Sequence, residues 1–370
     1  MNEFLFDHPF LLYTAVILLA TLISIITIPS IIHVSNVKHL FDDRDGERKS
    51  HRASIPRLGG VAIFCSFTIV SLIFLSYSAK FPTNFLLTSC IILFAVGLKD
   101  DLAGVNSITK FGVQFVAAAV VVLLGNVNFS SMYGIFGIYN INYAFGALLT
   151  IVTIILCINA FNLIDGIDGL AGTTGVVVNA TFGVLFIHMG QFEIACIAFS
   201  MVGAILGFLF FNYSPARIFM GDTGSFLIGF ISIVLAISYI ELNKFDPASM
   251  SIPLFYSAPA ISVAILIIPI FDTCRVFVIR LITGKSPFVA DMNHIHHRLL
   301  KLGCNHMQAT LLLMLINFLF IYLALELRSQ GNVKLILLFM GLGMLFNLTV
   351  TVLVKQKETK SMGSNKSSDH

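Results

Sequence analysis

The sequence has little charge: Asp, Glu, Lys and Arg make up 11% of its 370 residues, whereas apolar residues make up 57%. Because a soluble domain carries about 25% charged residues, this composition excludes an ordinary soluble protein. A helix needs about 20 mostly apolar residues to cross a bilayer, since lipid offers backbone amides no hydrogen-bond partner. Much of the chain divides into such runs, which predicts an all-α polytopic membrane protein.

The chain also lacks paired cysteines and a cleavable leader. Its six cysteines are scattered, without the spacing that would hold zinc or a redox disulfide, so we interpret them as small buried apolar residues. Its start carries Glu3 and Asp7 but no Lys or Arg, whereas a removable signal peptide begins with a basic region. We therefore expect the first apolar run to be a retained helix.

Eleven apolar runs predict transmembrane helices, with ten as the alternative because the third run is short. They lie at 10–33, 58–79, 84–98, 110–127, 144–162, 172–190, 193–213, 223–241, 253–281, 309–327 and 333–354. With the N-terminus outside, the outward segments hold four of the 22 Lys and Arg residues: Lys80, Lys244, Arg328 and Lys334. Basic residues favour the cytoplasmic side, so this orientation is predicted. We expect one transmembrane domain over 1–354 and a disordered cytoplasmic tail over 355–370.

Carboxylates gather at the inward ends of the apolar runs, at Asp100, Asp101, Asp165, Asp168, Asp222 and Asp272. Near a bilayer a carboxylate is costly unless it faces water, a cation or a cavity, so we predict an active site on the cytoplasmic face. One of Asp100 and Asp101 can bind a cation while the other accepts a proton, since adjacent like charges push their pKa values apart. A solvated helix end is the alternative. Lys110, at the start of the next run, is placed to reach phosphate.

Two glycine-rich segments carry further polar groups. In 159–172, Asn162, Asp165 and Asp168 supply oxygen ligands, and glycines let the backbone approach a ligand. A plain interhelical turn is the alternative. Asp222 stands just before the eighth run, where it can cap the helix, and the helix N-terminus favours phosphate.

A basic, histidine-rich loop follows the ninth run. His294, His296 and His297 precede Arg298. They could bind a transition metal, but no Cys or Glu completes the usual ligand set, and donation to phosphate oxygens explains them better. The first inward loop holds a charge cluster that sets topology and contacts anionic lipid.

Five motifs in order resemble the polyprenyl-phosphate N-acetylhexosamine-1-phosphate transferase superfamily (glycosyltransferase family 4), which includes the WecA-like and MraY enzymes. The resemblance covers about residues 10–354. The motifs are Arg48-Lys49-Ser50-His51 with 56–60, Asp100-Asp101, 159–170, 219–225 and 286–297. The run Ser-Pro-Phe, followed by Asp-x-x-His-Ile-His-His, is similar to the WecA group. An MraY-type enzyme, which takes a muramoyl-pentapeptide nucleotide, is the alternative within the superfamily.

The resemblance implies transfer of GlcNAc 1-phosphate, or another N-acetylhexosamine 1-phosphate, from a UDP-sugar to undecaprenyl phosphate at the bacterial inner membrane. It implies Mg²⁺ as cofactor, with Mn²⁺ as a substitute, no nucleic-acid partner, and a first membrane step of a cell-envelope polysaccharide. Catalytic roles fall to Asp100, Asp101 and Asp222, and metal ligation to Asp222 and Asn162. Nucleotide or phosphate binding falls to Lys49, His51, Lys110, Asp165, Asp168, His294, His296, His297 and Arg298.

Three questions stay open at this point. Asp272 and Arg275, three residues apart on one helix face, are interpreted as a structural pair. A homodimer remains an alternative to a monomer, since lipid-facing and partner-facing residues are both apolar. A transporter is the rival function, but transporter carboxylates usually lie near the middle of the bilayer, whereas these gather at one interface, which favours the enzyme.

Overall fold

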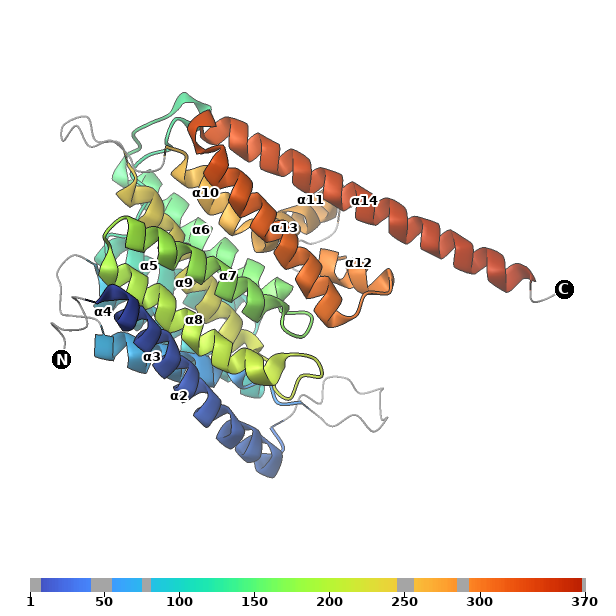
Figure 1. Ribbon diagram of the computed structural model, residues 1–370, viewed down its shortest axis with the longest axis horizontal. Helices are drawn as coiled ribbons and strands as arrows, with labels where there is room; N and C mark the ends of the chain where they lie inside the picture. Colours follow the sequence, from blue (N-terminus) through green and yellow to red (C-terminus); the bar gives the residue numbers. More distant parts are fainter. Residues whose placement is uncertain (1–7, 41–54, 75–80, 245–255, 285–292, 368–370) are drawn as a thin grey trace. The chain divides into compact units, whose positions relative to one another are not determined.

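Helices form nearly all of the secondary structure in the described residues, 8–40, 55–74, 81–244, 256–284 and 293–367 of a computed structural model, with side chains to 359 (Figure 1). Within these residues the extended structure is one isolated bridge between Ser131 and Asn140. The all-α prediction is therefore confirmed. The chain divides into two compact units, Met1–Phe255 and Tyr256–His370, where we predicted one domain over 1–354.

The first unit is a bundle around a central helix, α9. Its helices are α2 (Pro9–Lys38), α3 (Gly59–Phe74), α4 (Thr83–Ala103), α5 (Ser107–Ala119) with a π-helical continuation η1 (Val120–Leu124), α6 (Tyr143–Ile164), α7 (Leu170–His188), α8 (Phe192–Asn212) and α9 (Gly221–Leu242). α9 packs against α3, α4, α6 and α7. It is apolar on all faces, as expected of a helix buried on every side, and so it fixes the ends of its neighbours relative to one another.

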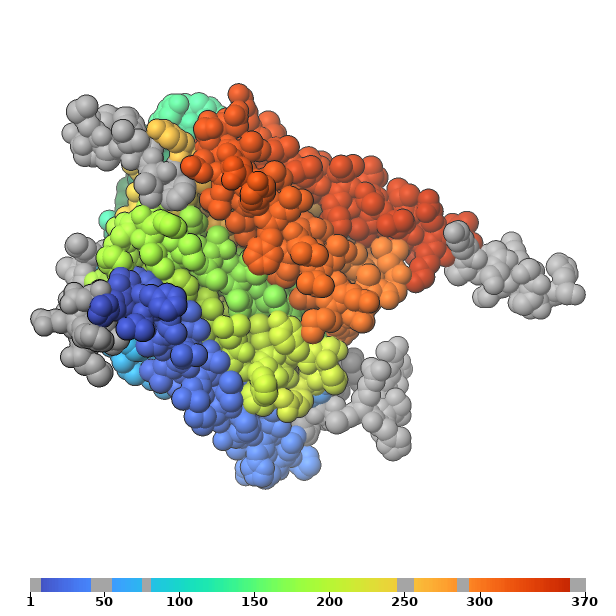
Figure 2. Space-filling view, viewed as in Figure 1, coloured from blue at the N-terminus to red at the C-terminus, as the bar shows by residue number. Residues whose placement is uncertain are grey.

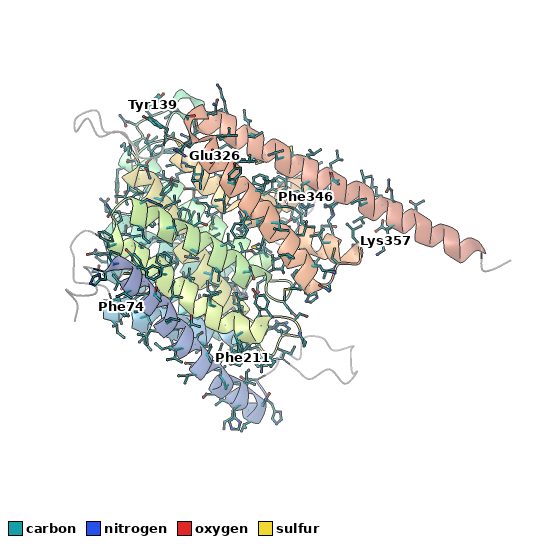
Figure 3. The ribbon with its side chains drawn as sticks, viewed as in Figure 1. Phe74, Tyr139, Phe211, Glu326, Phe346 and Lys357 are labelled. Carbon is teal, nitrogen blue, oxygen red and sulfur yellow. The ribbon has the colours of Figure 1, made fainter. Side chains whose placement is uncertain are left out.

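Polar side chains cap helix ends in this bundle and form contacts between its helices. Asn106 and Asn142 cap α5 and α6 by accepting from backbone amides three residues on. α2 lies along α8 (Figure 2), where Ser24 Oγ donates to Ala204 O at 2.9 Å. At the end of α8, the Arg217 guanidinium lies 4.7 Å from the centre of the Phe211 ring, which Figure 3 labels.

The second unit consists of α10 (Ala258–Ile265), α11 (Ile267–Ile282), α12 (Ile295–Lys301), α13 (His306–Glu326), a short 3₁₀ turn η3 (Arg328–Gln330) and α14 (Asn332–Ser367). α10 and α11 meet at an angle of 81°. Pro269 lies in the first turn of α11 and lacks an amide hydrogen, which accounts for the break. Lys357, near the far end of α14 (Figure 3), donates to Lys301 O at the end of α12.

The number of long apolar helices is lower than predicted. In the described part of the chain, eight helices are long and apolar enough to cross a bilayer, or nine if α10 and α11 form one broken span. The prediction of eleven also counted α3, of which 16 residues are described, and α4, whose last turn carries Lys99, Asp100 and Asp101. A multi-pass membrane protein is supported, whereas the outside N-terminus stays a prediction.

The C-terminal tail also differs from expectation. α14 continues to Ser367, so 355–367 are helical, where we predicted a disordered segment. Lys, Gln and Glu, which are good helix formers, fill most of 355–360, and no proline interrupts the helix.

Candidate active site

Four helix ends bring the predicted acidic site together at one end of the first unit. Asp100 and Asp101 lie in the last turn of α4, and Lys110 in the first turn of α5. Asn162 lies in the last turn of α6, and Asp222 in the first turn of α9. Motifs up to 122 residues apart in the chain therefore converge, as the sequence predicted.

Two segments that the sequence singled out hold each other beside this cluster. Phe219 N donates to Pro56 O at 2.8 Å, Gly59 N to Phe219 O at 2.9 Å, and Gly60 N to Met220 O at 2.8 Å. These bonds fix the chain entering α9 against the chain entering α3. The N-terminus of α9, and with it Asp222, is thereby held in place.

Glycines let the helix backbones approach closely enough for the carboxylates to meet. A Cβ atom on Gly97 of α4 would lie 2.6 Å from Thr223 Cα, and one on Gly60 would lie 2.1 Å from Gly224 N. Real Cβ atoms do not come this close to backbone, so any side chain at either position must displace a helix. These contacts set the register of α3 and α4 against α9.

Lys110 lies between two of the carboxylates. Its ammonium is 2.7 Å from Asp100 Oδ2 and 2.7 Å from Asp222 Oδ2. Asn162 Nδ2 donates to the other oxygen of Asp222 at 2.9 Å and to Ser225 Oγ at 3.1 Å. Because the amide nitrogen of Asn162 makes these bonds, its amide oxygen is the atom that would bind a cation.

Asp101 serves a different purpose from its neighbour. Its Oδ1 accepts from Asp222 N at 2.8 Å, and its Oδ2 accepts from Thr223 N at 3.0 Å and from Thr223 Oγ1. These amides belong to the first turn of α9, where unpaired N–H groups and the helix dipole favour a carboxylate. Asp101 therefore fastens α4 to the N-terminus of α9, and the capping role we considered for Asp222 falls to Asp101.

The two adjacent carboxyl groups differ in pKa because of their separate surroundings, and not through the mutual repulsion that we predicted. Burial acts against the charge of Asp100, but hydrogen bonds from Lys110 and Val105 outweigh it and lower its pKa. Burial raises the pKa of Asp101 to about 6, against the hydrogen bonds from Thr223. Asp100 is thus an ionised group and a weak base.

Asp165 and Asp168 lie in the turn between α6 and α7, next to the cluster. Burial, and then the charge of Asp222, raise the pKa of Asp165 well above its usual value. Asn212 holds this turn: its Oδ1 accepts from Gly169 N at 2.9 Å, and its Nδ2 donates to Ile218 O at 2.9 Å. We did not predict this role of Asn212, because a single Asn at the end of an apolar run carries no pattern.

Three or more potential metal ligands converge at one place in the described residues. One carboxylate oxygen from each of Asp100, Asp101 and Asp222 lies within 4.8 Å of the others. The histidines of 294–297 form no such group among these residues, and our preference for phosphate over zinc stays a prediction. Lys49 and His51 lie outside the described residues, and their roles stay predictions.

The predicted histidine segment belongs to the second unit. His294 Nδ1 lies 2.9 Å from Asp272 Oδ2. His296 is 1% exposed, its Nε2 has no hydrogen-bond partner among the described residues, and burial lowers its pKa to about 3. A buried polar atom without a partner is costly, so His296 is a candidate to bind a ligand.

Arg298 is engaged elsewhere, although we predicted that it binds phosphate. Its guanidinium donates to Asn347 Oδ1 at 2.6 Å and to Thr351 Oγ1, both on α14. These bonds attach α12 to α14 and favour a structural role. His297 lies beside His296, with 4.2 Å between the ring centres.

Comparison with known proteins agrees with the motifs. The model of glycosyl transferase family 4 matches residues 83–240. The undecaprenyl-phosphate alpha-N-acetylglucosaminyl 1-phosphate transferase of Pasteurella multocida is 34% identical over 279 residues, which cover 73% of this chain and 74% of that protein. The decaprenyl-phosphate N-acetylglucosaminephosphotransferase of Mycobacterium tuberculosis is 33% identical over 294 residues, 73% of this chain and 71% of that protein.

A further relative extends the agreement. The undecaprenyl-phosphate alpha-N-acetylglucosaminyl 1-phosphate transferase of Escherichia coli O157:H7 is 31% identical over 278 residues, 74% of this chain and 72% of that protein. The chain therefore belongs to glycosyl transferase family 4, and its resemblance to the polyprenyl-phosphate N-acetylhexosamine-1-phosphate transferases is confirmed.

Proposed function

We propose that the chain transfers GlcNAc 1-phosphate from UDP-GlcNAc to undecaprenyl phosphate. A phosphate oxygen of the acceptor bonds to the phosphorus that carries the sugar, the bond from that phosphorus to the bridging oxygen breaks, and UMP leaves. The observation that carries this proposal is the cluster of Asp100, Lys110, Asn162 and Asp222. The names of the relatives, which specify N-acetylglucosamine phosphate and a polyprenyl phosphate, support the sugar and the acceptor.

The donor set of this cluster fits a divalent cation, for which we propose Mg²⁺, with Mn²⁺ as a substitute. Carboxylate and amide oxygens are the ligands that hard cations prefer, and Asp222 with the amide oxygen of Asn162 would hold the ion. Asp101 accepts three hydrogen bonds from the first turn of α9, so we assign it to holding that helix end and assign the ion to Asp222. When bound, the ion neutralises phosphate charge and orients the diphosphate.

Lys110 and Asp100 would act on the acceptor. Donor and acceptor are both anionic, so transfer requires positioning and charge neutralisation more than covalent help. With a cation bound, the negative charge of Asp222 would be neutralised by the ion instead of by Lys110. The Lys110 ammonium would then be available to bind a phosphate. Asp100, with its lowered pKa, would orient Lys110 and not remove a proton, and a phosphate monoester with a second pKa of about 6 needs no base.

The predicted phosphate ligands complete the proposal. His294, His296 and His297 would bind the nucleotide diphosphate, and Asp165 and Asp168 would shape the turn beside the cation. Lys49 and His51 would contact phosphate as the family resemblance implies. The excess of basic residues in the inward segments supports an active site on the cytoplasmic face of the inner membrane.

The donor and acceptor can be tested with purified protein in detergent. We expect UMP release from UDP-GlcNAc only when undecaprenyl phosphate and Mg²⁺ are both added, and EDTA should stop it. A panel of UDP-N-acetylhexosamines, with UDP-N-acetylmuramoyl-pentapeptide included, should give the highest kcat/KM for UDP-GlcNAc. Turnover of the pentapeptide nucleotide alone would instead support the MraY-type alternative.

The rival class is tested by the same preparation in sealed vesicles. A transporter should move ions or solutes across the membrane without nucleotide. Such a flux, together with no UMP release, would overturn the proposed transfer.

Asp101→Ala separates a helix-capping role from metal binding. It removes three hydrogen bonds to the start of α9, and loss of a capping side chain costs about 0.5–2 kcal/mol. We expect a lower thermal unfolding midpoint in detergent and slower transfer, with Mn²⁺ binding retained. An unchanged midpoint together with lost Mn²⁺ binding would show that Asp101 is a metal ligand.

A further inference from the structure

Asp272 of α11 is a buried carboxylate that holds the start of the histidine segment. It is 4% exposed. Its Oδ2 lies 2.9 Å from His294 Nδ1, and its Oδ1 accepts from Ile295 N at 3.1 Å and from the Arg275 guanidinium at 2.9 Å. The sequence predicted only the pair with Arg275.

These bonds fix both the backbone and the ring of His294. Ile295 is the first residue of α12, so Asp272 anchors the N-terminus of that helix. The Arg275 guanidinium also donates to Asn293 O, on the other side of His294. The ring of His294 stacks on that of His296, with 5.6 Å between ring centres and 16° between planes.

The bond to Asp272 also decides which nitrogen of His294 is available. A carboxylate only accepts, so the nitrogen facing it, Nδ1, carries the proton. The orientation of a functional histidine is usually set in this way, by the partner of its other nitrogen. Nε2 is then the atom left for a ligand, beside His296, whose Nε2 has no partner in the described residues.

We propose that Asp272 is a positioning residue for the transfer reaction: it holds His294 with its proton on Nδ1 and leaves Nε2 to bind a phosphate oxygen of the nucleotide. This inference rests on the proposed function, because it gives His294 its orientation for that step. Asp272 acts through His294 and does not itself touch substrate.

A double-mutant cycle on the full-length protein tests whether Asp272 acts through His294. We expect His294→Gln to slow transfer about 100-fold, within the range for a positioned donor or base. Asp272→Asn alone should slow it about 10–100-fold, as for other carboxylates that orient a histidine. The double variant should be no slower than His294→Gln alone, because the two changes remove one function.

Asn317→Ala is the matched control for general damage to the second unit. Asn317 is fully buried and donates to Ala264 O and Ile265 O, away from the histidines. Its effect should multiply with that of His294→Gln. If the effect of Asp272→Asn also multiplies with that of His294→Gln, Asp272 is merely structural and the inference is wrong. An unchanged rate in His294→Gln would instead remove His294 from the proposed function.

The tautomer can be observed independently of activity. At alkaline pH, protein labelled with ¹⁵N-histidine should show His294 protonated at Nδ1, with the signal assigned by its loss in His294→Gln. Asp272→Asn should move the proton to Nε2, because an amide N–H facing Nδ1 favours the other tautomer. A wild-type ring protonated at Nε2 would overturn the inference even if transfer is confirmed.

Discussion

Asp222→Asn is expected to reduce transfer of GlcNAc 1-phosphate by about 1,000-fold, the upper range for loss of one group that stabilises transition-state charge. Asn keeps the size of the side chain but removes the charge that faces Lys110 and the proposed cation. The measurement is UMP release at saturating UDP-GlcNAc, undecaprenyl phosphate and Mg²⁺. The variant should elute from size exclusion in detergent as the wild type does.

Glu241→Gln is the matched control, because it makes the same chemical change at the other end of α9. The two residues are 19 apart in the chain, which places them about 28 Å apart along a helix. Glu241 accepts from Ser130 and Tyr133 and is not part of the proposed active site. Its variant should transfer at nearly the wild-type rate. Full turnover by Asp222→Asn would remove Asp222 as the cation ligand.

Gly97→Ala is expected to reduce transfer by about 100-fold, because a shift of about 1 Å in a reacting group can cost that much. The added methyl group would lie 2.6 Å from Thr223 Cα and 2.7 Å from Thr223 N. α4 would have to move away from α9, and Asp100 would move relative to Asp222. The measurements are the transfer rate and the thermal unfolding midpoint, both of which should fall.

Gly112→Ala is the control for the same substitution in a helix without the close contact. A Cβ atom on Gly112 of α5 would have no neighbour within 4 Å. Alanine is favoured over glycine inside a helix by about 1 kcal/mol, so this variant should be as stable as the wild type or slightly more so, with normal transfer. Similar losses in both variants would show that the contact of Gly97 with Thr223 does not control the site.

Much of the fold followed from composition, and the limits of that prediction have physical causes. Long apolar runs predicted helices because unpaired backbone amides are too costly in lipid. An apolar run does not show where a helix bends, as between α10 and α11, so the described residues hold eight or nine long apolar helices where we predicted eleven spans. The helix in 355–367 was missed because its polar composition resembles that of a disordered tail.

The sequence predicted which polar residues form the candidate site, but not the contacts that those residues make. Asp100, Asn162 and Asp222 meet as expected, because each lies at the end of an apolar run that we predicted to face inward. The position of Lys110 between two carboxylates depends on the register of α4, α5 and α9. The bond from His294 to Asp272 joins the residue before α12 to α11, 22 residues earlier in the chain. Neither the contacts of Lys110 nor the bond between His294 and Asp272 can be predicted from the spacing of residues in the sequence alone.

Mn²⁺ binding, measured from the electron paramagnetic resonance of the free ion, tests most directly whether Asp222 and Asn162 hold one divalent cation. With UDP-GlcNAc present, wild type and Glu241→Gln should each bind a single Mn²⁺ per chain with the same affinity. Asp222→Asn and Asn162→Ala should bind it far more weakly. Unchanged affinity in both of these variants would contradict a cation site at this end of the first unit.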